Sequence, residues 1–320
     1  MVLPLPPRHA DRRNGTHDIL FVGRTLRTAA PLLCLLLTRC DAVTRGFLSP
    51  AGPVASATRH EFLLVCLVML LVIGPVLLLT PLVAWHYRLS NTRSAYRPQW
   101  GFSWSLEGLI WIPPVIIVVV LAIFLWGSTH RLDPYRKLPG QPIEIQAVAL
   151  DWKWLFIYPG QDVGTVNRLV IPAGLPVHLS LTSATVMQSF LMPRLAGQIY
   201  AMAGMRTQLN FEANAPGSFL GENVQFNGMG FQNQKFEVAA LDADGFARWL
   251  AQTKAQPDRL DPAEYETLSR RSTLPQPIAF GAVEPGLFDH IVALKQPSGH
   301  TIDLRSLPPR PLPMETSPHD

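Results

Sequence analysis

The chain has 320 residues, of which 48% are hydrophobic and only 16% are charged, an apolar share that is high for a wholly soluble protein. Its formal net charge of +4 comes mainly from short basic flanks. No basic patch studded with aromatic residues accompanies them, which argues against nucleic-acid binding, and the composition instead predicts membrane segments joined to a globular part.

The first 39 residues are predicted to form an unstructured extension followed by a signal peptide. The apolar stretch 29–38 is too short to span a bilayer and has arginines on both sides. Leu37-Thr38-Arg39-Cys40 resembles a bacterial lipoprotein signal, although Arg39 replaces the small residue usual at that position. Three alternatives stay open, namely acylation of Cys40, a plain signal peptide and an uncleaved anchor, and an exterior segment is expected over 40–61.

Two apolar runs predict membrane-spanning helices over 62–85 and 106–126. The first has no formal charge, and the second carries only Glu107, close to its start. Each reaches the roughly 20 residues that a bilayer core requires, and prolines within them are tolerated in a membrane. The loop 86–105 contains three arginines and no acid, which predicts that it is cytoplasmic and that both termini face outward.

From residue 133 the pattern changes to short strands separated by turn signals. Stretches rich in β-branched and aromatic residues predict strands at 142–150, 152–158, 166–171, 176–183, 198–203, 206–213 and 234–241. Together they indicate an exterior all-β Greek-key sandwich over 133–242. A helical segment is predicted over 243–275, with helices at 244–256 and 262–271 and Asp261 capping the second. The Pro-rich tail 276–320 is expected to be irregular.

The exterior domain lacks cysteine, because Cys34, Cys40 and Cys66 all lie in or beside the N-terminal apolar segments. It therefore offers neither a disulfide nor a thiolate metal ligand. The sequence also contains no Gly-rich phosphate loop and no Ser-His-Asp signature, so we expect no catalysis by this chain alone.

Two membrane helices followed by an exterior sandwich resemble subunit II of the haem-copper terminal oxidases, whose exterior domain has a cupredoxin fold. The resemblance covers about 58–255 and rests on motifs in a fixed order. These are Leu106-Glu107-Gly108-Leu109-Ile110-Trp111 with Pro113-Pro114, Asp151-Trp152-Lys153-Trp154, Thr182-Ser183 through Ser189-Phe190 and Met192-Pro193, and Gln198-Ile199-Tyr200-Ala201-Met202-Ala203-Gly204-Met205.

In the cytochrome c oxidases of that family, the resemblance implies a dinuclear copper centre. Its ligands are a histidine before Ser-Phe and the pattern Cys-x-Glu-x-Cys-Gly-x-x-His-x-x-Met. In this chain the corresponding positions are Gln188, Asn223, Gln225, Asn227, Phe231 and Gln234. Neutral amides are poor substitutes for thiolates and imidazoles, and a phenyl ring cannot ligate, so we expect this chain to bind no metal.

This loss of ligands resembles the quinol-oxidising branch, the cytochrome bo-type ubiquinol oxidases. A membrane-dissolved quinol can reach buried haems from within the bilayer, which makes an exterior copper relay dispensable. The resemblance implies a non-catalytic subunit of a proton-pumping quinol:oxygen oxidoreductase in the bacterial inner membrane, with the C-terminal domain in the periplasm. Haems and copper would belong to subunit I, with subunits III and IV as further partners and no cytochrome c.

Glu107 is the one ionisable residue within either predicted span, and intramembrane carboxylates are functional candidates. The resemblance implies that it stands at the entrance of a proton-uptake path. The alternative is an interfacial glutamate near a helix start capped by Ser105. Two other functions also stay open: a cytochrome c oxidase subunit II with a degenerate copper site, and a membrane-tethered β-sandwich that acts as an assembly or binding lipoprotein.

Overall fold

The computed structural model describes residues 46–92 and 99–295. The predicted signal peptide and Cys40 lie outside the described residues, as do residues 93–98 of the interhelical loop and the tail from 296. The lipidation of Cys40 therefore stays a prediction.

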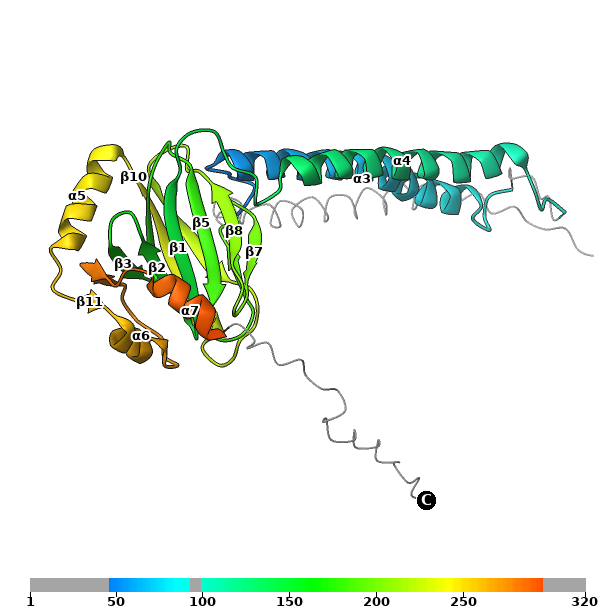
Figure 1. Cartoon of the computed structure of the whole chain (residues 1–320). Coiled ribbons are helices and arrows are strands. Elements are labelled where there is room, and N and C mark those ends of the chain that lie inside the picture. Colours follow the sequence, from blue (N-terminus) through cyan, green and yellow to red (C-terminus); the bar gives the residue numbers. More distant parts are fainter. Residues whose placement is uncertain (1–45, 93–98, 296–320) are drawn as a thin grey trace, which may run out of the picture.

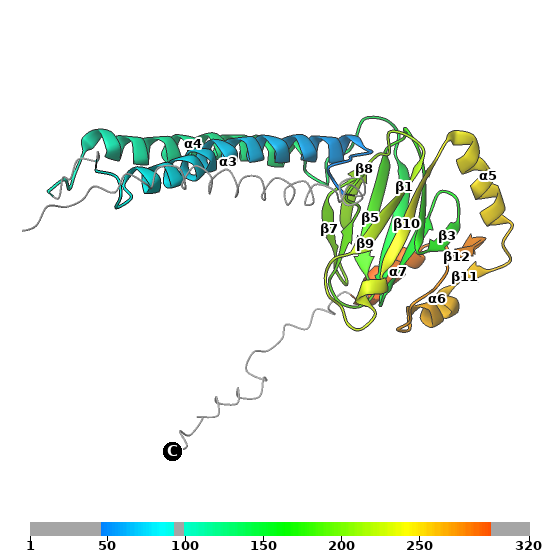
Figure 2. The same cartoon turned by 180° about the vertical axis from the view of Figure 1, so that it is seen from behind.

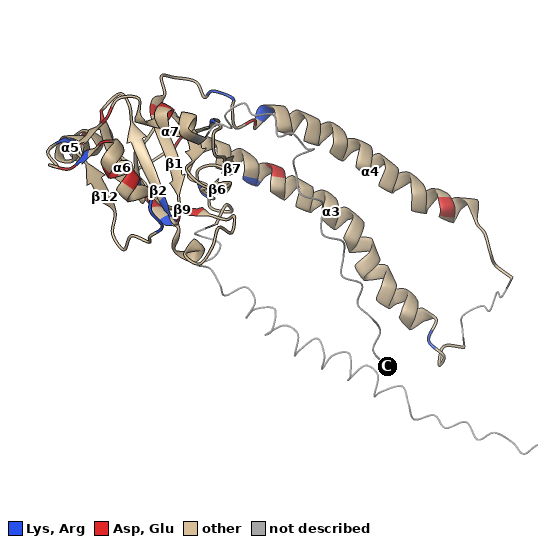
Figure 3. Cartoon of the chain, turned by 60° about the horizontal axis from the view of Figure 1, so that its bottom comes forward, with Lys and Arg blue, Asp and Glu red and all other residues tan. Residues whose placement is uncertain are grey.

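Two long helices form a hairpin that projects from a β-domain (Figure 1). α3 spans Pro53–His86 and α4 spans Trp104–Arg131, and both are long and apolar enough to cross a membrane. Between their ends the helices carry almost no charged side chains (Figure 3). The start of α3 and the end of α4 adjoin the domain, while the end of α3 and the start of α4 lie far from it (Figure 1, Figure 2).

Both helices begin before the predicted spans. α3 includes residues 53–61, which were expected to be an exterior segment, because Pro53 is well suited to the first turn, where its missing N–H has no helical partner. α4 starts after Ser103, whose carbonyl accepts the N–H of Glu107 at 2.9 Å. The prediction of Ser105 as the cap is therefore wrong, since Ser105 already lies within the first turn.

The β-domain is a sandwich of two sheets, as predicted. The strands are β1 Ile143–Leu150, β2 Lys153–Tyr158, β3 Val163–Val166, β4 Arg168–Pro172, β5 Val177–Ser183, β6 Gln188–Leu191, β7 Gln198–Ala201, β8 Thr207–Phe211, β9 Gly217–Asn223, β10 Lys235–Leu241 and β12 Ile278–Phe280. One sheet has the order β12-β3-β2-β1-β5-β8 and the other β4-β10-β9-β6-β7. The pairs β1–β5 and β4–β10 are parallel, and the remaining pairs in the two sheets are antiparallel.

The central strands are buried on both faces. In β2, Trp154 and Phe156 point into the core between the sheets, where they meet Phe190 and Phe236. The alternate residue Leu155 points to the opposite face and joins a second apolar cluster. This double burial explains why the strand is apolar almost throughout rather than alternating.

The C-terminal extension covers that second face of the sheet from residue 260 onward (Figure 1), whereas its earlier residues Trp249 and Leu250 pack against the core between the sheets. It consists of α5 Ala243–Lys254, β11 Arg259–Leu260, α6 Pro262–Ser269, β12, β13 Ala282–Val283 and α7 Leu287–Lys295. Asp261 caps α6 as predicted, since its side chain accepts the N–H of Glu264 at 2.9 Å. The expectation of irregular chain is wrong over 278–295, because Phe288 and Ile291 of α7 are buried against the sheet.

The single strand predicted over 166–171 is two strands in different sheets. Asn167 separates β3 from β4 with φ of 59°, and its side-chain oxygen accepts the N–H of Trp154 at 2.9 Å. This left-handed residue lets the chain cross from one sheet to the other. Strands β6 and β9 were not predicted, and they flank the loops that carry the candidate site.

Candidate functional site

The site lies at one end of the sandwich, where three connections meet. The β1–β2 turn, the β5–β6 loop and the loop between β9 and β10 come together through side-chain amides. Gln188 and Gln234 both donate from Nε2 to the carbonyl of Leu150, at 3.3 Å and 3.1 Å. Gln188 and Gln234, which are 46 residues apart in the sequence, therefore share one carbonyl acceptor.

Gln234 is the centre of this amide network, defined by Gln188, Asn223, Asn227 and Gln234. Its Nε2 also donates to Oε1 of Gln188, and its Oε1 accepts from Nδ2 of Asn223 at 2.9 Å and of Asn227 at 2.7 Å. A glutamine has two donors and two acceptor lone pairs in its amide, so all four are used. The side chain is completely buried, and its hydrogen bonds offset the cost of removing it from water.

Asn223 connects the network to the backbone of its own loop. Its Oδ1 accepts the N–H groups of Ser189 at 3.0 Å and Gln225 at 2.9 Å. Its Nδ2 donates to the carbonyl of Gln225 at 2.8 Å in addition to Gln234. The amides therefore fasten β6 to the loop after β9.

Four of the six degenerate ligand positions come together, and two do not contribute side chains. Gln225 joins the network through its main-chain N–H and C=O groups. Phe231 lies in a 3-10 turn, where its ring packs against Phe226 with centroids 5.7 Å apart. Four of the predicted side chains are thus brought together as hydrogen-bonding groups, whereas Gln225 takes part through its backbone and Phe231 packs against Phe226.

The donor chemistry does not fit a copper ion. Within residues 46–92 and 99–295, no group of three or more His, Cys, Asp and Glu lies together as a metal site would require. The amide nitrogens are occupied as donors and have no lone pair to offer a metal, and the oxygens of Asn223 and Gln234 are already paired. We therefore assign no electron-transfer step to this loop.

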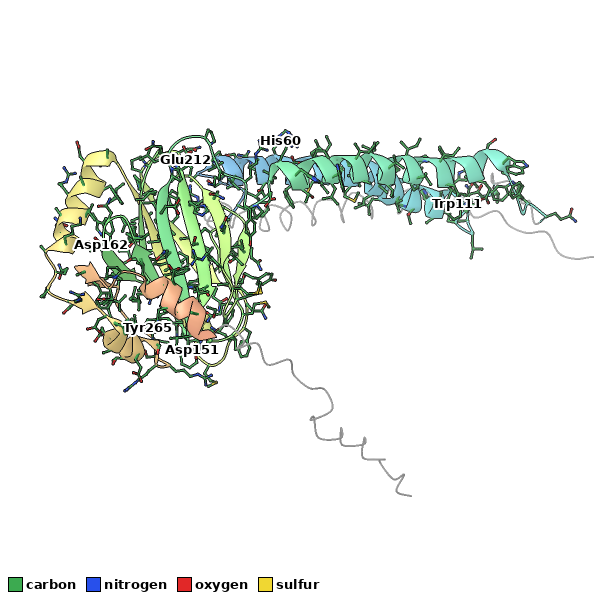
Figure 4. All side chains as sticks on the ribbon, viewed as in Figure 1. His60, Trp111, Asp151, Asp162, Glu212 and Tyr265 are labelled. Carbon is green, nitrogen blue, oxygen red and sulfur yellow. The ribbon has the colours of Figure 1, made fainter. Side chains whose placement is uncertain are left out.

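A charged cluster continues from the amide network toward the C-terminal extension. Gln188 Nε2 lies 3.3 Å from Oγ1 of Thr185, which donates to Oδ1 of Asp151 at 2.7 Å. Oδ2 of Asp151 accepts from Arg271 Nε at 2.8 Å. Figure 4 shows Asp151 at the lower end of the sandwich, close to Tyr265 of α6.

Lys153 fastens the extension to the same end of the domain. Its side chain is completely buried, and Nζ donates to the carbonyl of Arg270 at 2.7 Å and to Oγ of Ser272 at 2.6 Å. Desolvation lowers the pKa of Lys153, and the nearby Asp151 carboxylate opposes that shift. Sequence analysis did not single out Lys153 as a structural contact, although a lysine between apolar strand residues was the available signal.

The indole ring of Trp152 packs against the loop between β9 and β10. The φ of 70° at Trp152 places it in the left-handed region, and its indole N–H lies 3.4 Å from the carbonyl of Asn227. A β-carbon on Gly230 would lie 2.2 Å from the indole ring. Only glycine at that position lets the loop lie directly on the tryptophan.

Apolar side chains are exposed around the network. Phe226 is 72% exposed and Met229 is 92% exposed, at the tip of the loop after β9. We call this surface the apolar rim, and its members are Val186, Met187, Tyr200, Met205, Val224, Phe226 and Met229. Large apolar side chains gathered at one end of a domain are typical of a protein interface.

Glu107 lies far from these residues, in the first turn of α4. Its Oε2 accepts the indole N–H of Trp111 at 3.0 Å, and its side chain is partly buried. Figure 4 shows Trp111 toward the hairpin end that is remote from the domain. The carboxylate and the amide network are therefore at opposite ends of the molecule.

Two family models match the exterior part of the chain. Residues 160–238 match the periplasmic domain of cytochrome c oxidase subunit II, and residues 254–294 match the COX aromatic rich motif. The second match corrects the resemblance expected over 58–255, which ends too early. The aromatic rich motif includes α6 and α7, the helices that cover the sheet.

Curated relatives match most of the chain. It is 43% identical over 260 residues to cytochrome bo(3) ubiquinol oxidase subunit 2 of Pseudomonas putida, covering 81% of this chain and 82% of that protein. It is 41% identical over 286 residues to ubiquinol oxidase subunit 2 of Acetobacter aceti, covering 88% and 92%. Quinol oxidase subunit 2 of Bacillus cereus is 35% identical over 247 residues, covering 76% and 84%.

Proposed function

The chain belongs to the subunit 2 family of the haem-copper quinol oxidases, and we propose that it admits protons and docks the catalytic subunit without relaying electrons. It acts as a subunit of a quinol oxidase complex that uses oxygen as acceptor, and it is not catalytic alone. It is anchored by two apolar helices and carries an exterior domain. The two alternative functions, a cytochrome c oxidase subunit II with a degenerate copper site and a membrane-tethered assembly or binding lipoprotein, are not favoured by these relatives.

One observation carries the proposal that electrons bypass this chain. Every group of the Gln234 amide is hydrogen-bonded, at the centre of the loops where the copper-binding members of the family hold their metal. Among the described residues, no thiolate or imidazole group joins these amides, and the one network oxygen without a hydrogen-bond partner, Oδ1 of Asn227, is a neutral amide oxygen. Electrons would therefore pass from a membrane quinol to haems and copper in the partner subunit I.

The proposed role of Glu107 rests on its position and its partner. It is an acid within an otherwise uncharged stretch of α4, at the end of the hairpin away from the exterior domain. The Glu107 side chain is partly buried, and its carboxylate accepts the N–H of Trp111, which holds it at that end of the hairpin. We assign it to the entrance of a proton-uptake path into the catalytic subunit, on the cytoplasmic side of the bacterial inner membrane.

The test is a Glu107→Gln complex. The substituted side chain keeps an oxygen that can accept the Trp111 N–H, so the change removes ionisation more than structure. We expect slower proton uptake and slower quinol oxidation, with normal haem content. A Glu266→Gln complex, altered at an exposed position of α6 in the exterior domain, serves as the matched control. Unchanged turnover and unchanged proton uptake in Glu107→Gln would contradict the role.

The apolar rim is proposed to face the catalytic subunit. Phe226 and Met229 are too exposed to contribute to this domain's own core, and burying each in an interface would stabilise the complex by roughly 1.5–3 kcal/mol. Subunits III and IV remain expected partners that the family resemblance implies.

A Phe226→Ser, Met229→Ser double variant tests the role of the apolar rim. It should co-purify with less haem subunit than a control variant with two serines introduced on α5, for example at Ala247 and Ala251.

A further inference from the structure

A second candidate site lies between the hairpin and the domain. There a cavity of about 280 Å³ is lined by both membrane helices, the linker after α4 and the edge of the sandwich. Its cationic lining residues are Arg131, Arg136 and Lys137, and its acidic lining residue is Asp133. Figure 3 shows basic residues in this linker, at the domain end of the hairpin.

The cavity walls are held in place by specific contacts. Asn210 is buried, and its main-chain N–H and its Nδ2 both donate to the carbonyl of Pro134 at 3.0 Å, which fastens the linker to β8. Asp133 Oδ1 accepts the N–H of Tyr135 at 2.9 Å, and its carbonyl accepts the N–H of Arg136 at 3.0 Å. The turn that carries Arg136 and Lys137 is therefore defined by hydrogen bonds.

The charges in the cavity do not balance. Arg131 is paired with Glu61 at 2.7 Å. Across the part of the chain that the structure describes, Arg136 and Lys137 have no carboxylate within ion-pair distance. Two cations thus remain beside one aspartate whose carboxylate already accepts a backbone N–H.

The position of these cations is unusual for a membrane protein. Lysine and arginine near membrane helices are concentrated on the cytoplasmic side, whereas these follow α4 on the side of the exterior domain. Arg131 lies five residues beyond Trp126, or about 7 Å at about 1.5 Å per residue. Since the headgroup layer extends about 5–8 Å beyond the hydrocarbon core, the cavity opens at the level of lipid phosphates.

We propose that this cavity binds a phosphate group through Arg136 and Lys137, with Arg131 at its membrane side. Two sources share that chemistry, the headgroup of an anionic phospholipid in the outer leaflet and free phosphate from solution. The guanidinium supplies paired N–H donors that suit phosphate oxygens, and the lysine supplies a mobile positive charge. The bound anion would balance the uncompensated cations and fix the angle between hairpin and domain.

The test uses the intact oxidase complex, purified in mild detergent, with an Arg136→Gln, Lys137→Gln double variant. Native mass spectrometry would measure binding of phosphatidylglycerol, of zwitterionic phosphatidylcholine, and of phosphatidylglycerol in competition with inorganic phosphate. Each cation near an anionic lipid is worth about fivefold in affinity, so we expect the double variant to bind phosphatidylglycerol about twenty-five-fold more weakly. Phosphatidylcholine should bind equally to both complexes.

Two further variants separate charge from structure. Arg136→Lys, Lys137→Arg keeps both charges and should retain most of the affinity. Arg248→Gln, Lys254→Gln removes one arginine and one lysine from α5, on the far side of the domain, and should bind like the unaltered complex. Displacement of the lipid by inorganic phosphate would identify a general phosphate site, and lack of displacement a lipid-specific one. Equal phosphatidylglycerol binding by the unaltered complex and the Gln double variant would overturn the proposal.

Discussion

At the scale of single residues, Gln234 explains how the loops at the predicted copper-ligand positions are held together. Its amide bonds to the carbonyl of Leu150 at the end of β1, to Gln188 at the start of β6 and to Asn223 at the end of β9. A hydrogen bond contributes about 1 kcal/mol net, whereas leaving a buried polar group unpaired costs about 1–3 kcal/mol. Replacing Gln234 should therefore lower the free energy of unfolding by more than the net contribution of its own hydrogen bonds.

Gln234→Leu is expected to destabilise the folded chain by about 3 kcal/mol, because Asn223 and Asn227 would each lose an acceptor while staying buried or partly buried. Denaturant unfolding of the detergent-solubilised chain, followed by tryptophan fluorescence, measures the change. Gln232→Leu in the same turn alters an exposed side chain and should change stability by less than about 0.5 kcal/mol. Equal stability of the two variants would refute the structural role of the network.

The burial of Tyr265 predicts that the folded chain loses stability at alkaline pH. Burial raises the pKa of Tyr265 to about 12 from 10.0, so the folded chain keeps a proton that the unfolded chain releases. The stability that this proton contributes is present below pH 10 and is lost as the pH rises from 10 toward 12. Because a pKa unit corresponds to about 1.4 kcal/mol, the loss should approach about 3 kcal/mol.

The measurement compares unfolding free energies at about pH 9 and about pH 11. Tyr265→Phe should lose less stability over this range than the unaltered chain. Burial also raises the pKa of Tyr158 and lowers that of Lys153, but both residues are present in each protein, so their effects cancel in the comparison. Identical pH dependence in the two proteins would contradict the assignment to Tyr265.

At the scale of elements, the C-terminal extension is part of the domain's core. α6 and α7 cover the face of β1 and β2 that points away from the sandwich interior. Without this cover, Leu150 and Leu155 would be exposed, so the sheet and the extension stabilise each other. The extension is also fastened at the site, through the contacts of Lys153 and Asp151.

Lys153→Met should loosen the extension while leaving the sandwich folded. The substituted side chain fills a similar apolar space but cannot donate to the carbonyls of Arg270 and Ser272. We expect faster amide hydrogen exchange over 259–295, measured by mass spectrometry of peptides. Lys235→Met, at an exposed position of β10, should leave exchange in that segment unchanged. If both variants exchange alike there, Lys153 does not fasten the extension.

The elements that sequence reasoning predicted are those with strong local patterns. The two spans have long uncharged runs, and β1, β2, β5 and β10 are rich in β-branched or aromatic residues. Strands β6 and β9 were missed because their pairing depends on distant partners, and the break at Asn167 depends on a left-handed conformation. Helix α7 was missed because its Pro-rich surroundings outweighed its own apolar residues.

The candidate site was predictable in position but not in chemistry. Family resemblance placed Gln188, Asn223, Asn227 and Gln234 in the copper loops, and the structure brings these four together. Which amide donates to which is set by the relative placement of three loops, and sequence spacing carries no such information. Asp151 and Lys153 were quoted only as part of a motif, since their partners lie about 120 residues further along the chain.

At the scale of the whole molecule, the hairpin and the domain divide the proposed functions. Apolar side chains are exposed along most of α3 and α4 in the isolated chain, as expected for surfaces that meet lipid or a partner subunit. The Glu61–Arg131 pair joins the two helices at their domain ends. Proton entry is proposed at the far end, docking at the apolar rim, and phosphate binding between them.

We propose that this chain carries no copper relay and that quinol is the electron donor. The most direct measurement is the copper content of the full-length chain, purified away from its partners after expression with added copper. We predict no stoichiometric copper and no near-infrared copper band. A pair of copper ions bound within residues 133–255 would contradict the account, because the amide network of Gln234 could not then exist in the form described here.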